Sequence, residues 1–204
     1  DSHSIEAYAG VLNRALAARG IDRAHLYGRN AGGSVAVELA RTAPDRAASL
    51  MLEGPMILSE RERQAMAPHW ALAADPVWDG HHLTSLWHQL RDQQLFYPWY
   101  EQTMAASRFV EPVVTPEALH EQVVELIKHP GSYKPSWDAA FGYPLRERLA
   151  EIRRPVWIGA SPADVFAPCL DTGARLLGIE AAAVSPSPGT AAPQLIEFLA
   201  QIGN

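Results

Sequence analysis

The residues of this chain that could do chemistry begin with Gly28-Arg29-Asn30-Ala31-Gly32, between a strand-like and a helix-like stretch. The spacing is that of Gly-x-Ser-x-Gly, in which a strained turn presents a nucleophile and small flanking residues let strand and helix close together. Asn30 stands where the Ser would be. Asn tolerates left-handed backbone, but its amide has no proton that a base can remove near neutral pH. We therefore expect Asn30 to donate a hydrogen bond to a carbonyl or an oxyanion, or to position a water, rather than to attack.

The alternative for this turn is a glycine-rich helix start that binds phosphate. A dinucleotide-binding turn has the pattern Gly-x-Gly-x-x-Gly, and a P-loop has a Lys after its last Gly. Neither pattern is present around Gly28 and Gly32. We therefore interpret the turn from the strand and the helix that flank it.

Those elements alternate between helix and strand. Apolar spacing predicts a helix over 4–20 with Ser4 as its N-cap. After it, the chain reads as a strand over 21–28, a helix over 36–46 and a strand over 47–55. In this order and around this turn, the chain resembles the α/β-hydrolase superfamily, and the resemblance recurs in 155–168 and near the C-terminus. It implies a partial α/β-hydrolase fold of class α/β: a mostly parallel sheet flanked by helices, with an inserted helical cap. The domains expected from it are 1–58 (core part with the turn), 59–141 (helical cap) and 142–204 (C-terminal core part).

The resemblance also implies roles for single residues. The Ala31 N–H would be an oxyanion donor, and Asp164 would be the acid of the catalytic triad. Glu53 occupies the second acid position that the superfamily offers, at the end of the strand before the cap, and we prefer Asp164 because of its place in its loop. Thr190 stands where superfamily members carry the catalytic His. Two of the three triad positions, 30 and 190, therefore lack the usual side chain.

The expected cap is rich in aromatic residues. Four of them could floor a pocket for an apolar or aromatic ligand, although packing within the protein explains them as well. They are Trp87, Phe96, Trp99 and Tyr100. Helices are expected from an N-cap at Asp79, over 116–128 after Thr115, and over 137–141 as the last helix of the cap. Residues 145–152 are expected to return the chain to the core.

One face of the helix after Asp79 carries His81, Ser85, His88 and Asp92 at spacings of four, three and four. Such a stripe could bind a metal or replace a lost catalytic base, but a solvated polar face is the commoner reason for it, and we favour that interpretation. We predict neither a metal nor a cofactor.

The beginning of the sequence carries a further expectation. In the superfamily several strands precede the helix expected over 4–20, and without them the strand over 21–28 would expose an apolar edge. Three explanations are open: the chain is part of a longer protein, another polypeptide supplies the strands, or the gene product has decayed. We favour the first, and expect either a missing N-terminal segment or self-association at that edge.

Composition limits the partners. The chain has 204 residues, 48% of them hydrophobic, a net charge of -6 and no basic run, which argues against nucleic acid as a ligand. It has no apolar run long enough to span a bilayer, so we expect no membrane partner. Cys169 is its single cysteine, which favours a reducing, cytoplasmic location. The expected partner is a small molecule.

Two hypotheses for function follow. The first is a divergent enzyme that acts on a small apolar or aromatic carbonyl compound, with Asn30 and Ala31 as polarising groups and Asp164 or Glu53 as acid or base. The second is a catalytically inactive pseudoenzyme that binds a ligand or a partner. We place the first slightly ahead because most proteins of the superfamily are enzymes, which is an argument from the fold alone.

Overall fold

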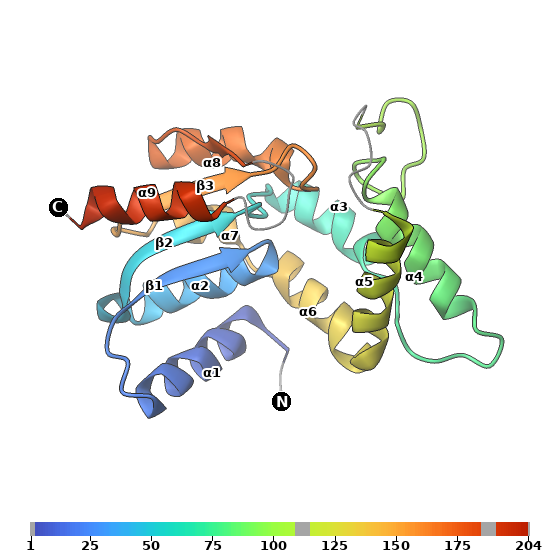
Figure 1. Ribbon diagram of the computed structural model, residues 1–204, viewed down its shortest axis with the longest axis horizontal. Helices are drawn as coiled ribbons and strands as arrows, with labels where there is room; N and C mark the ends of the chain where they lie inside the picture. Colours follow the sequence, from blue (N-terminus) through green and yellow to red (C-terminus); the bar gives the residue numbers. More distant parts are fainter. Residues whose placement is uncertain (1–2, 109–114, 185–190, 204) are drawn as a thin grey trace. The chain divides into compact units, whose positions relative to one another are not determined.

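The structure is a computed structural model that describes residues 3–108, 115–184 and 191–203. The chain divides into two compact units (Figure 1). The first unit comprises Asp1–Glu60 and Tyr143–Asn204, and the second comprises Arg61–Gly142. In the sequence, the bounds of the second unit are similar to those of the helical insertion predicted over 59–141.

The first unit is built on a four-stranded sheet in the order β1-β2-β3-β4. Every described pairing in it is parallel. The strands are β1 (Ala24–Arg29), β2 (Ala47–Glu53), β3 (Val156–Ala160) and β4 (Ala182–Ala183). The helical segments of this unit are α1 (Ile5–Ala18), α2 (Ala31–Thr42), η1 (Pro44–Arg46), α7 (Leu145–Leu149), η2 (Ala167–Cys169), α8 (Leu170–Leu177) and α9 (Ala192–Ile202). The expected α/β class and parallel sheet are confirmed.

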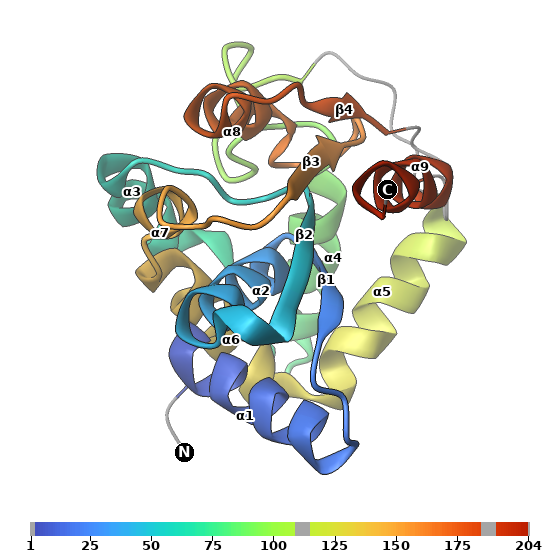
Figure 2. The same ribbon diagram turned by 90° about the vertical axis from the view of Figure 1, so that its left-hand side faces the viewer.

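Successive side chains along each strand point to opposite faces of this sheet, as the period of a strand requires. Met51 and Trp157 are register partners and form one apolar cluster with Leu195, Phe198 and Leu199 of α9. Leu52 faces the other way, toward Gly33 of α2. Figure 2 shows α8 and α9 on opposite sides of β3. The sheet is therefore covered by helices on both faces.

Strand β1 lies at one edge of the sheet, because among the described residues it pairs with β2 alone. Its burial alternates: Leu26 and Gly28 are buried, whereas His25, Tyr27 and Arg29 are exposed. Strand β2, which is paired on both sides, is buried along most of its length. The expectation that a further strand pairs with β1 stays a prediction.

Several boundaries differ from those predicted. Helix α2 begins at Ala31 rather than at residue 36, because the chain enters the helix directly from the turn at Asn30. The N-cap of α4 is Gly80 in left-handed conformation, while the Asp79 side chain accepts from the His81 N–H at 3.1 Å. Helix α6 begins at Pro130 rather than at residue 137; Pro is well suited to a first turn, where its missing N–H costs nothing.

The second unit is helical and contains α4 (His81–Asp92), α5 (Pro116–Lys128), α6 (Pro130–Gly142) and nearly all of α3 (Glu60–Trp70). An aromatic cluster forms its core: the Trp70 ring packs against Trp137 and Phe141, with centroids 5.9 and 5.6 Å away. Gln89 is buried beside it; its side chain accepts from Leu72 N at 2.9 Å and donates to the Tyr133 hydroxyl. In the described part of the chain, no helix is long and apolar enough to cross a membrane.

Candidate functional site

The turn at Asn30 has the strained geometry that the Gly-x-Asn-x-Gly pattern predicts. Asn30 has φ 47° and ψ -118°, and it is the one non-glycine residue with positive φ among those described. A side chain at position 28 could not fit, because a Cβ there would lie 2.4 Å from the Gly32 carbonyl oxygen. Such strain costs of order 1–3 kcal/mol and persists only where the surrounding structure enforces it. Strand β1 and helix α2 thus hold residue 30 in a fixed direction.

The Asn30 side chain is joined directly to Asp164. Its Nδ2 donates to the Gly54 carbonyl oxygen at 3.0 Å and lies 3.3 Å from each carboxylate oxygen of Asp164. These neighbours are acceptors, so the nitrogen rather than the oxygen of the amide must face them. Both N–H groups of the amide are therefore engaged, and only Oδ1 is left for a ligand.

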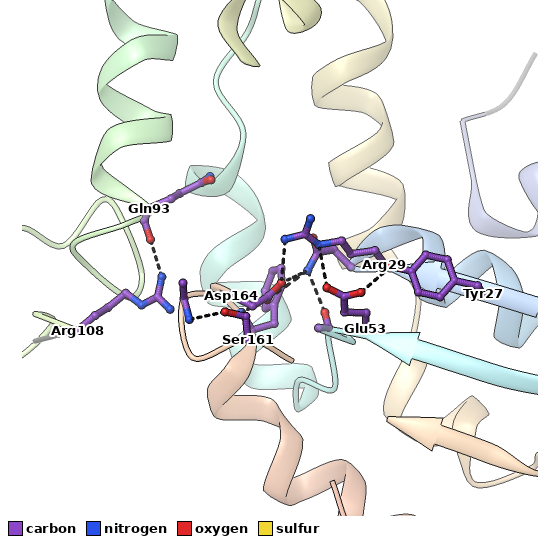
Figure 3. A network of polar contacts seen from close by, with 11 residues as sticks. Tyr27, Arg29, Glu53, Gln93, Arg108, Ser161 and Asp164 are labelled. Atoms are coloured by element: carbon purple, nitrogen blue, oxygen red, sulfur yellow. Dashed lines mark hydrogen bonds and ion pairs between the residues drawn. The ribbon is translucent and has the colours of Figure 1, made fainter. Parts of the chain in front are cut away.

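Asp164 follows β3 in a tight turn and is nearly enclosed, with 2% of its side chain exposed. The turn is closed by its own N–H, which donates to the Ser161 carbonyl oxygen at 2.9 Å. The carboxylate accepts from the Phe166 N–H at 2.8 Å, and Arg29 Nη2 lies 3.6 Å from it (Figure 3). A backbone donor, an amide and a guanidinium thus surround one buried carboxylate.

Gly54 makes this contact possible. It follows β2 with φ +56°, and a Cβ there would lie 2.6 Å from both carboxylate oxygens of Asp164 and 2.7 Å from Asn30 Nδ2. Only glycine leaves room for the amide and the carboxylate at this point of the chain. The Gly54 N–H donates to the Gly159 carbonyl oxygen at 2.8 Å, which ties the residue to the end of β3.

Glu53 belongs to the same network but faces different partners. Its carboxylate accepts from the Tyr27 hydroxyl at 2.6 Å, and Arg29 Nε lies 3.8 Å from it (Figure 3). Burial and the hydrogen bond to Glu53 raise the pKa of Tyr27 to about 12, so this phenol is a donor at neutral pH. Only the backbone of Glu53 meets Asn30, by accepting from its N–H at 2.9 Å. Of the two predicted acids, it is Asp164 whose carboxylate the fold brings to the Asn30 side chain.

The remaining predicted residues of the first unit have different outcomes. Ala31 is the first residue of α2, so its N–H has no acceptor within the helix and lies at the positive end of the helix dipole. That position suits an oxyanion donor. Thr190 lies outside the described residues.

The four predicted aromatic contacts belong to the second unit. Trp99 is buried, and its indole N–H donates to the Trp70 carbonyl oxygen at 2.8 Å, as expected of a packing residue. Tyr100 is half-buried against Trp99 and His69, with ring centroids 5.9 and 5.1 Å away. Trp87 and Phe96 are also half-buried. A ligand-binding role for these residues stays a prediction.

The expectation of a uniformly solvated polar face on α4 is wrong. His81 and His88 are exposed, but Asp92 is buried and accepts from Arg91 Nε and Gln102 Nε2, each at 2.7 Å. Asp92 therefore serves the packing of the second unit. No group of three potential metal ligands is found among the described residues.

Three residues of the network escape prediction from the sequence: Tyr27, Arg29 and Gly54. Arg29 and Tyr27 look like ordinary exposed residues of an edge strand, and nothing in their local spacing points to a carboxylate. Gly54 carried a usable signal, since a glycine directly after a buried strand often marks a close approach of backbone to another group.

The arrangement has a clear chemical consequence. In a Ser-His-Asp triad the imidazole lies between nucleophile and acid and makes a hydrogen bond of about 2.6–3.2 Å to each. Here the side chain of residue 30 and the acid are 3.3 Å apart, so an imidazole cannot lie between them. In the described residues the side chain of Asn30 and the carboxylate of Asp164 are in direct contact.

Comparison with solved structures identifies the fold. No protein-family model and no curated protein matches the sequence. MenH from S. aureus superposes with a TM-score of 0.67 and 18% identity over 100% of this chain and 78% of its own. MGS-M2, an alpha/beta hydrolase enzyme from a Medee basin deep-sea metagenome library, gives 0.67 and 17% over 100% and 74%. A hydrolase from Pseudomonas aeruginosa PA01 gives 0.60 and 18% over 100% and 74%. The chain therefore has the α/β-hydrolase fold.

Proposed function

We propose that this chain binds a small apolar or aromatic carbonyl compound at the Asn30 turn without forming an acyl-enzyme. The observation that carries the proposal is the direct hydrogen bond between Asn30 Nδ2 and the Asp164 carboxylate. This hydrogen bond occupies the amide N–H groups of Asn30, which a divergent enzyme would need in order to polarise a substrate carbonyl. It also fills the space in which a catalytic imidazole would lie. Both points favour the second hypothesis, a binding protein, over the divergent enzyme.

The groups left at the turn suit such a ligand. The Ala31 N–H is a donor at the start of a helix, a position that favours a carbonyl oxygen or a negative charge. Asn30 Oδ1 is an acceptor for which no donor is found among the described residues. A donor and an acceptor on adjacent residues match an aromatic carboxamide, which carries a carbonyl oxygen and an N–H side by side.

The test compares turnover with binding in the same preparation. We expect the parent protein to hydrolyse 4-nitrophenyl acetate no faster than buffer alone does. We also expect it to bind benzamide, which titration calorimetry measures. Asn30→Gly keeps the positive φ that the turn requires but removes Oδ1, so it should weaken benzamide binding while the fold is retained. Gly32→Ala, on an open face of α2, is the control that should bind like the parent.

Two outcomes would contradict the proposal. Turnover of the ester well above the buffer rate that disappears in Asn30→Gly would establish the divergent enzyme instead. Benzamide binding that is absent, or equal in the parent and in Asn30→Gly, would place any ligand away from this turn.

A further inference from the structure

A second candidate binding site lies at the opposite end of the sheet from Asn30. A groove of about 470 Å³ is lined by residues at the amino ends of three strands and by the last turn of α9. In Figure 1 the C-terminal end of α9 lies on the side from which the arrows of β1 and β2 start. Since β1 rises about 3.3 Å per residue, Ala24 at this end lies roughly 16 Å from the other end of the strand. The groove is thus separate from the Asn30 turn.

The charge of this groove contrasts with that of the whole chain. Arg23, Arg153 and Arg154 line it together with His25, and no acidic residue among those described does, although the chain has a net charge of -6. The acidic neighbour with a recorded contact is Asp45, 3.5 Å from Arg154 Nη2, and its side chain is fully exposed. An exposed pair of this kind contributes little. The groove therefore keeps a positive character.

Two of the guanidinium groups are held in place by neutral partners. Arg154 Nη2 donates to the Pro44 carbonyl oxygen at 2.8 Å, and Arg153 Nη1 donates to the Ala150 carbonyl oxygen at 2.8 Å. Carbonyl oxygens fix the position of a guanidinium without cancelling its charge, and each group has five N–H donors. Both groups are thus oriented in advance and keep donors for an anion.

His25 and the apolar floor complete the groove. The Nδ1 of His25 shares a hydrogen bond of 2.9 Å with Ser49 Oγ, which holds the ring. When Nδ1 accepts from Ser49, Nε2 carries the proton and is a donor. The rest of the lining is apolar and includes Pro155 and Ile202. A ligand that fits this groove therefore combines an anionic group with a small apolar body.

We propose that the groove binds a small phosphate monoester with an aromatic or aliphatic body. A phosphate monoester carries a charge of about -1.5 to -2 at pH 7 and three acceptor oxygens, which suits several guanidinium groups better than a single carboxylate does. The volume is within the range of small-molecule sites. This binding is independent of the carbonyl ligand at the Asn30 turn.

The experiment titrates the full chain with phenyl phosphate by calorimetry. We expect saturable binding that weakens as salt is added, that is stronger than binding of inorganic phosphate or benzoate, and that is absent for benzyl alcohol. Arg23→Gln and Arg153→Gln should each weaken binding about tenfold or more, because each removes a charge-assisted bond. Arg175→Gln makes the same change of charge on α8, outside the groove, and should bind like the parent.

Arg23 is the key position, because its guanidinium has no partner in the part of the chain that the structure describes, so its replacement should leave the fold intact. Circular dichroism of each variant checks this point. Absence of phenyl phosphate binding at millimolar concentration, or equal weakening by Arg175→Gln, would overturn the proposal. Equal affinity for inorganic phosphate and phenyl phosphate would refute the role given to the apolar floor.

Discussion

Asn30 and Asp164 are joined by a direct hydrogen bond, with Asn30 Nδ2 lying 3.3 Å from each carboxylate oxygen. The two residues are 134 positions apart, and each is held by its own backbone: a positive φ at the start of α2 for one, and a closed turn after β3 for the other. The fixed backbones start the two side chains from positions that favour this contact. The contact is therefore a built feature of the first unit, and the following predictions test it from several directions.

Gly54→Ala is expected to disrupt this contact. The new Cβ would lie 2.6 Å from the Asp164 oxygens, at a residue with φ +56°. Backbone strain and overpacking together should lower the free energy of unfolding by about 2 kcal/mol or more. Gly32→Ala is the matched control: its Cβ meets nothing within 4 Å, and α2 should gain up to about 1 kcal/mol from better helix propensity. Urea unfolding of both variants measures the difference; equal stabilities would show that position 54 has room after all.

Asn30→Asp should introduce a repulsion that depends on pH. It replaces the amide donor with a carboxylate beside Asp164, so at pH 7 the free energy of unfolding should fall by about 1–3 kcal/mol. One carboxyl of the new pair then has a folded-state pKa above its unfolded value. The penalty is therefore present above that folded pKa and disappears as the pH falls below the unfolded one. Asn30→Gly, which adds no charge, is the control, and identical pH profiles for the two variants would contradict direct contact with Asp164.

Much of this arrangement could be read from local sequence. The strand, the strained turn and the helix around Asn30 are encoded within a dozen residues, and the cap of α1 at Ser4 depends on one hydroxyl that accepts from Ala7 N at 3.1 Å. Chain order after that turn indicated the parallel sheet, since consecutive strands joined by helices pair in parallel.

Contacts between distant segments could not be predicted in the same way. Glu38 lies on a helix in a position that the sequence leaves unremarked, yet it is buried and accepts from the Tyr143 hydroxyl 105 residues later. Spacing places Asp92 on a polar face of its helix, but spacing defines a stripe and not what covers it. The joining of Asn30 to Asp164 depends on Gly54, whose function becomes visible only when the ends of β2 and β3 are adjacent.

Tyr143→Phe should destabilise the first unit at neutral pH but not in acid. Glu38 accepts from Arg41 Nε and Nη2 at 2.9 and 2.8 Å and from the Tyr143 hydroxyl at 2.8 Å. Burial by itself raises the pKa of Glu38, but the hydrogen bonds from Arg41 and Tyr143 outweigh it, so the pKa is lowered overall. A lowered folded pKa contributes stability above the unfolded pKa, and this stability is lost as the pH falls through the folded value.

The loss expected for Tyr143→Phe at pH 7 is about 1–3 kcal/mol, because a buried charged acceptor loses a donor. Denaturant unfolding at pH 7 and at acid pH measures it, and the parent and the variant should converge as the pH falls. Tyr8→Phe removes an exposed phenol oxygen that lies 2.7 Å from His3 Nδ1, and should change stability little at either pH. A pH-independent difference between Tyr143→Phe and the parent would mean that Glu38 is not charged in the fold.

Trp99→Ala should show whether this indole packs the second unit or binds a ligand. Because Trp99 is buried and hydrogen-bonded to Trp70, its truncation should cost about 3–5 kcal/mol of stability. Trp78→Ala removes the same side chain from a fully exposed position and should stay within about 0.5 kcal/mol of the parent. Thermal unfolding and benzamide titration of both variants separate the roles. A stable Trp99→Ala variant that no longer binds benzamide would restore the ligand-binding role predicted from the sequence.

The last prediction concerns positions 30 and 190, where we expect from the sequence that the Ser and the His of a triad are replaced. Asn30→Ser shortens the side chain at the turn and releases the Asp164 carboxylate from the amide, which opens space for an imidazole. Thr190→His supplies an imidazole at the position where we expect the catalytic His from the sequence. Neither change alone should suffice, because a Ser without a base is a poor nucleophile and a base without a Ser has nothing to activate.

We therefore expect the double variant, and neither single variant, to hydrolyse 4-nitrophenyl acetate at least about tenfold faster than the parent, since a general base contributes about a hundredfold or more in a mature site. Steady-state hydrolysis of all four proteins measures this. Adding Asp164→Asn to the double variant should remove most of the gain, because the imidazole then loses the carboxylate that orients it. If the parent already turned over the ester at an enzyme-like rate, and Asn30→Ser left that rate unchanged, residue 30 could not occupy the nucleophile position.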